Sequence, residues 1–66
     1  MMKNFYFTKW ISEKDVAALT GISVSTLQKD RFYERGIPYF KIGRSVRYAL
    51  SDVESFMAAK RITPSL

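Results

Sequence analysis

The chain is 66 residues long, and its 11 Lys and Arg against 6 Asp and Glu give a net charge of +5. This length suffices for one small domain and no more. The lack of Cys and His in the sequence excludes disulfide bonds, thiolate zinc sites, cysteine nucleophiles and histidine general bases. The basic balance favours a polyanionic partner, above all nucleic acid, although a basic soluble protein is the simpler alternative.

The acidic residues form no pattern typical of a catalytic or metal site, and several are expected at helix ends. We therefore expect a protein that is not an enzyme and that holds no metal and no cofactor. The sequence has no long apolar run and no signal-peptide pattern, so we expect it in the cytoplasm.

Turn signals and composition indicate one domain at residues 10–62, between an N-terminal extension at 1–9 and a C-terminal tail at 63–66. In the extension, residues 5–7 read Phe-Tyr-Phe, which predicts a short strand or a tail that lays its rings on the core. The next pair, Trp10–Ile11, directly precedes the first helix signal, and we expect both side chains to pack inward.

The first helix is predicted to begin after Ser12. This residue is a good N-cap, and Asp15 three residues later indicates a capping box with a shorter acid. Val16 and Leu19 are expected to share the inward face. Gly21 is expected to end the helix, where a left-handed residue is usually needed.

The second helix is predicted to begin after Ser23, with Leu27 as its inward anchor. At about 100° per residue, the polar side chains that point outward are Ser25, Thr26, Gln28 and Lys29. Such side chains can reach base edges and phosphates in the major groove, although most polar helix faces are merely solvated. A short helix, a glycine turn and a second helix with a polar, basic face is the plan of a helix-turn-helix, so we expect DNA contacts here, Ser23 included.

The second helix is expected to lose its regular geometry over residues 33–35 and to end at Gly36. Arg31 lies near the Leu27 side, and we expect a structural role in which it reaches an acid or a carbonyl group. Phe32 and Tyr33 are expected to cover the core.

A hairpin is predicted next. Residues 39–42 alternate in polarity, and we expect Phe40 and Ile42 to face inward. Residues 43–45 form the predicted turn and 46–48 the return strand. The polar and basic residues at or near the tip are Lys41, Arg44, Ser45 and Arg47. A basic hairpin after a helix-turn-helix is a wing, which can follow the phosphate backbone or occupy the minor groove; alternatively, it only closes the core.

The last helix is predicted to begin at Ser51, because Ser51 and Glu54 match a full S-x-x-E capping box. Its inward stripe is expected to comprise Val53, Phe56 and Met57. The complete order of elements predicts a mainly α fold with a small β-hairpin: a winged helix-turn-helix of three helices and a two-stranded wing.

The segments GIPYFKIGRSVRY (36–48) and SDVESF (51–56) carry a family resemblance. The chain resembles the small winged helix-turn-helix proteins of the AlpA and excisionase group, which are distant relatives of the MerR-type DNA-binding domain. The resemblance covers about Trp10 to Arg61. It implies that residues 23–29 are the N-terminal half of a recognition helix.

The same resemblance implies that residues 41–47 are the wing, with Arg44 at its tip. Similar sequences often have an aromatic residue, commonly Trp, where this chain has Asp30. An acid at this position could repel phosphate, or it could pair with Lys29, Arg31 or Arg35.

The resemblance implies a phage or mobile-element protein that binds double-stranded DNA at an attachment site or a promoter. One role is that of an excisionase, which binds cooperatively as several copies and bends DNA for a tyrosine recombinase. Another is that of an AlpA-like transcriptional regulator, and the sequence leaves both open. In either role we expect association with the bacterial nucleoid. A protein-binding module that uses the aromatic N-terminus and the last helix is the alternative.

Overall fold

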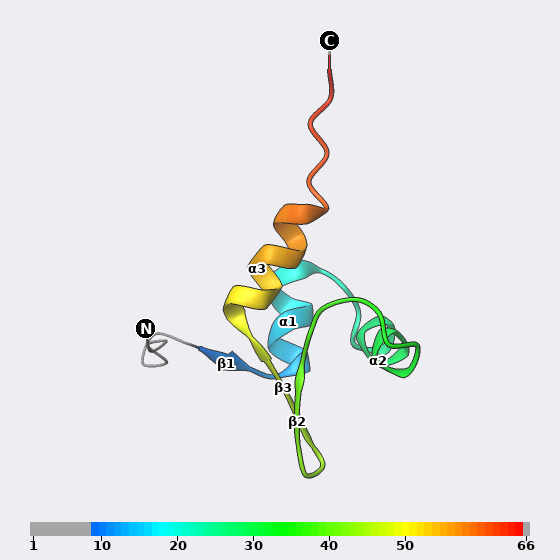
Figure 1. Cartoon of the computed structure of the whole chain (residues 1–66), viewed down its shortest axis with the longest axis vertical. Coiled ribbons are helices and arrows are strands. Elements are labelled where there is room, and N and C mark those ends of the chain that lie inside the picture. Colours follow the sequence, from blue (N-terminus) through cyan, green and yellow to red (C-terminus); the bar gives the residue numbers. More distant parts are fainter. Residues whose placement is uncertain (1–8, 66) are drawn as a thin grey trace, which may run out of the picture.

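The computed structural model describes residues 9–65, so the strand or tail predicted for residues 5–7 lies outside the described residues. The elements are β1 (Trp10–Ile11), α1 (Glu13–Thr20), α2 (Val24–Phe32), β2 (Phe40–Ile42), β3 (Ser45–Ala49) and α3 (Leu50–Ala59). The β2–β3 hairpin projects from one end of the molecule, and α3 leads to the C-terminus at the opposite end (Figure 1). The predicted winged helix-turn-helix is confirmed.

The sheet has three strands in the order β1-β3-β2, rather than the two predicted. Strand β1 pairs antiparallel with the end of β3, with Trp10 opposite Ala49 and Ile11 opposite Tyr48. The Leu50 N–H then donates to the Lys9 carbonyl oxygen at 2.8 Å. Strand β1 could not be predicted from the sequence, because two residues are too few to show an alternating pattern. It is a strand only because it pairs with β3.

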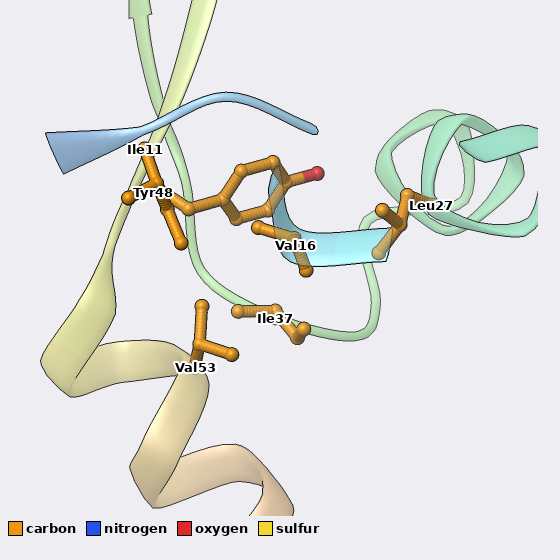
Figure 2. Close-up of a cluster of buried hydrophobic side chains, with 6 residues drawn as sticks. All are labelled: Ile11, Val16, Leu27, Ile37, Tyr48 and Val53. Atoms are coloured by element: carbon orange, nitrogen blue, oxygen red, sulfur yellow. The ribbon is translucent and has the colours of Figure 1, made fainter. Parts of the chain in front are cut away.

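The core lies where α1, α3 and the inner face of the sheet meet. Its buried side chains are Ile11, Val16, Leu27, Ile37, Tyr48 and Val53. The Tyr48 ring extends across this cluster, with its hydroxyl group directed toward α2 (Figure 2). Every described element except β2 contributes at least one buried side chain.

Helix α1 has the predicted ends. The Ser12 side chain accepts from the Asp15 N–H at 3.2 Å, and the Ser12 N–H donates to Asp15 Oδ2 at 3.2 Å. Gly21 ends the helix with φ = 78°. Val16 is buried as expected, but Leu19 is 63% exposed, so its inward placement was wrong; the core lies on the other flank of Val16, where α1 faces α2 and β3.

The end of α2 differs from the prediction. Phe32 and Tyr33 were expected to cover the core, but they are 78% and 59% exposed. Their rings instead pack edge to face on each other, with centroids 5.0 Å apart. The reason is that Phe32, five residues after the buried Leu27, points to another side of α2 at about 100° per residue, and that α2 ends there.

Asp30 holds this turn. Its backbone carbonyl accepts from the Arg35 N–H at 2.9 Å, and its carboxylate accepts from Arg35 Nε, also at 2.9 Å. The acid therefore pairs with one of the three cations that the sequence left open. Gly36 follows with φ = 88°, and a side chain there would lie 2.9 Å from Asp30 Oδ2.

The apolar side chains of β2 face outward, whereas they were predicted to face inward. Phe40 and Ile42 are 43% and 68% exposed, because they lie opposite Arg47 and Ser45 on the outer face of the sheet. Trp10 joins them there: it is 46% exposed, and its ring lies 4.7 Å from that of Phe40. The expected inward packing of Trp10 was therefore wrong, whereas Ile11 is buried. Alternation identifies a strand, but it does not say which face is inward.

Helix α3 begins at Leu50, with Ala49 as an N-cap that makes no side-chain hydrogen bond. The capping box predicted for Ser51 and Glu54 was therefore wrong. Strand β3 runs directly into α3, so Ser51 already lies inside the first turn. Val53 is buried and Phe56 packs against the core, but Met57 is 40% exposed.

The contact at Gly36 predicts the relative cost of two substitutions. Gly21→Ala should lower the free energy of unfolding by roughly 1–2 kcal/mol, because the backbone is left-handed but the space beside it is empty. Gly36→Ala should cost roughly 2–4 kcal/mol, because the added carbon also collides with Asp30. Urea unfolding of both variants provides the comparison, and equal costs would contradict the close contact.

Candidate nucleic-acid interface

The polar face of α2 is exposed as predicted. Leu27 is buried, and the exposed polar residues of the helix N-terminal half are Ser25, Thr26, Gln28 and Lys29. The Ser23 hydroxyl group accepts from the Thr26 N–H at 3.1 Å and donates to Thr26 Oγ1 at 2.9 Å. Ser23 therefore caps α2 as expected. Contact between these side chains and DNA stays a prediction.

Arg31 connects α2 to the rest of the domain. Its Nη2 donates to Glu13 Oε1 at 3.0 Å, and its Nη1 donates to the Tyr48 hydroxyl oxygen at 2.7 Å. Burial lowers the pKa of the Arg31 guanidinium, but the hydrogen bonds to Tyr48 and Glu13 outweigh burial and raise it. The side chain is therefore charged at any physiological pH, and the structural role expected for Arg31 is confirmed.

Glu13 has a second partner on α2. Its Oε2 atom accepts from Gln28 Nε2 at 3.2 Å. This role of Glu13 was not predicted from the sequence. No local signal could reveal this contact, because the two residues are 15 positions apart.

The wing residues do not share one face. Arg44 is exposed in the turn at the tip. Lys41 lies opposite Val46 and therefore shares the inner face of the hairpin, whereas Ser45 and Arg47 lie on the outer face. The Arg47 side chain folds back so that Nη1 donates to the Val46 carbonyl oxygen at 2.8 Å.

A cleft of about 390 Å³ lies between the start of α1 and the β3 side of the wing, from the tip at Arg44 to Arg47. Arg31 and Lys14 line it on the helix side, and Arg44 and Arg47 line it on the wing side. Lys14 was not predicted from the sequence as part of this site. The feature that could have drawn attention to Lys14 is its position: it is a cation in the first turn of a helix, where the helix dipole favours an acid. Glu13, which is paired with Arg31, also lines the cleft, but the four cations outnumber this acid, so the cleft can accept an anion that passes between the helices and the wing.

Within residues 9–65, no three acidic, Cys or His side chains gather in a way that could hold a metal ion. In the same part of the chain, no helix has the length and apolar character needed to cross a membrane.

The geometry agrees with a comparison against protein families. A sequence model described as Helix-turn-helix domain matches residues 10–61. The chain belongs to this family. Membership in the Helix-turn-helix domain family supports DNA as a partner of the chain. Searches of the curated proteins and of the solved structures found no match.

The two arginine pairs at α2 predict different stabilities. Arg31→Ala should lower the free energy of unfolding by roughly 2–3 kcal/mol, because it removes the charged hydrogen-bond donor of the buried Tyr48 and of the part-buried Glu13. Arg35→Ala should cost less than about 1 kcal/mol, because the Arg35 side chain is 60% exposed. Thermal or urea unfolding tests both, and a larger cost for Arg35→Ala would contradict the structural role of Arg31.

Proposed function

We propose that this chain is a sequence-specific double-stranded DNA-binding protein of a phage or mobile element, and that it acts without catalysis. Helix α2 lies in the major groove, and the β2–β3 wing contacts the adjacent backbone or minor groove. The observation that carries the proposal is that the helices and the wing border one cleft with cations on both sides: Lys14 of α1 and Arg31 of α2 face Arg44 and Arg47 of the wing.

A single copy offers one recognition helix and one wing, which cover only a few base pairs. We therefore propose that several copies bind neighbouring sites. The resemblance to the AlpA and excisionase group supports an excisionase that bends an attachment site for a tyrosine recombinase. An AlpA-like regulator of promoters in the element is the second form of the same proposal. Either role places the protein on the bacterial nucleoid.

A protein-binding module is the other candidate, and a specific observation favours it. Trp10, Phe40 and Ile42 form an exposed apolar face on the outside of the sheet, beside a hollow of about 300 Å³. Apolar patches of this kind often mark contacts between proteins.

A DNA-binding assay separates these candidates. The full chain is tested by gel shift against the attachment site and promoter region of its element, and against a randomised duplex library. DNA recognition predicts enrichment of a short motif and an affinity that falls steeply as salt rises. No binding at low salt would leave only the protein-binding candidate.

The wing tip predicts a salt-dependent phenotype. Arg44→Ala should weaken binding to every sequence and reduce the slope of log affinity against log salt by about 1, because one phosphate contact is lost. Arg61→Ala, which removes an equal charge just beyond α3, serves as the control and should leave the slope unchanged. An unaltered slope and affinity for Arg44→Ala would show that the wing does not contact DNA.

The polar face of α2 predicts a sequence-dependent phenotype. Gln28→Ala should weaken binding to the preferred site by roughly 1–3 kcal/mol, because a bidentate base contact is lost, and should affect random DNA little. Lys29→Ala should weaken binding to both. Fluorescence anisotropy with a selected site and a scrambled duplex measures, for each variant, the affinity relative to the unaltered chain on the two duplexes. Equal losses on both duplexes for Gln28→Ala would rule out base reading by this residue.

A further inference from the structure

We propose that Glu13 is a positioning residue that fixes the amide orientation of Gln28, and thereby contributes to the base preference of α2. This inference rests on the proposed recognition of DNA by α2. It adds a residue that lies on another helix and that makes no contact with the bases itself.

The geometry places one carboxylate between two side chains of α2. Glu13 Oε1 accepts from Arg31 Nη2 at 3.0 Å, and Glu13 Oε2 accepts from Gln28 Nε2 at 3.2 Å. The Glu13 and Arg31 side chains are only 26% and 17% exposed. Arg31 is held in turn by Tyr48 on β3. The carboxylate is therefore held by an ion pair anchored in the core, while Gln28 lies on the exposed surface.

The chemistry of the two groups dictates one orientation. A carboxylate only accepts hydrogen bonds, whereas an amide presents a donor end and an acceptor end that exchange when it rotates by 180°. Glu13 therefore binds the NH₂ end of Gln28 and disfavours the flipped amide. One N–H and the carbonyl oxygen of Gln28 are left for DNA, and this is the donor–acceptor pair that recognises the N7 and N6 atoms of adenine.

The charge of Glu13 gives a second, opposite effect. An acid beside the DNA-facing helix opposes the approach of phosphate, even when an arginine is paired with it. Its removal should leave the affinity for random DNA unchanged or higher. Loss of base preference without loss of general affinity therefore distinguishes positioning of Gln28 from mere damage to the interface.

The test uses two variants of the full chain, each selected against a randomised duplex library. In Glu13→Gln the single carbonyl oxygen goes to the charged Arg31, so the new NH₂ group faces Gln28 and favours the flipped amide. The preference at the base read by Gln28 should fall by roughly three- to tenfold and shift toward another base. Glu13→Ala should relax the same preference without the shift, and Glu54→Gln on α3 is the charge-matched control that should change nothing.

A double-mutant cycle shows whether Glu13 acts through Gln28. In the Gln28→Ala background, Glu13→Gln should leave the base preference unchanged. An undiminished effect in that background, or an unchanged preference in both single variants that still fold by circular dichroism, would overturn the inference.

A measurement without DNA separates this inference from the proposed function. In NMR spectra of the free protein, the side-chain amide signals of Gln28 should move in Glu13→Gln and Glu13→Ala but not in Glu54→Gln. Signals that do not move would overturn the positioning role even if the chain binds DNA. Failure of the unaltered chain to bind DNA would overturn the proposed function, and with it any part of Glu13 in base preference.

Discussion

The guanidinium group of Arg31 joins three elements that must keep a fixed relation for α2 and the wing to act together. It binds Glu13 at the start of α1 and Tyr48 in β3 while its own helix carries the polar face. Helix α2 contributes only Leu27 to the fully buried core. Apolar packing therefore constrains the orientation of α2 only weakly. The two charged hydrogen bonds are directional, and they supply the orientation that a single leucine cannot.

The acids closest to the polar face of α2 are both paired with arginines. Glu13 binds Arg31, and Asp30 binds Arg35 in the turn after the helix. The Glu13–Arg31 pair joins α1 to α2, and the Asp30–Arg35 pair closes the turn after α2. Each pair reduces the repulsion that an unpaired acid would exert on phosphate. Asp30 is thus a part of the turn that leads to the wing.

The outer face of the sheet departs from an apolar-inside arrangement, as do the exposed rings at the end of α2. The helices cover only the inner face, from which Tyr48 and Val46 pack into the core. Trp10 and Phe40 can therefore shield only each other, as their edge-to-face contact shows. An antiparallel sheet with one covered face is common in a small domain, where the polypeptide is too short to cover both.

The sequence by itself determined the features whose partners lie within a few residues. The caps at Ser12 and Ser23, the left-handed Gly21 and the tight turn before Ser45 follow from local hydrogen bonds and backbone sterics. The order of elements and the exposed face of α2 follow from the same signals together with the position of Leu27.

Only the tertiary structure decided which faces turn inward and which distant residues meet. Phe40 faces outward because the pairing of β2 with β3 assigns it to the uncovered side, and Ser51 lies inside α3 because β3 leads straight into the helix. The Glu13–Gln28 contact and the place of Lys14 in the cleft depend on how α1 packs against α2 and the wing. Such contacts join segments far apart in the chain, so their geometry is set by the packed core and not by local propensity.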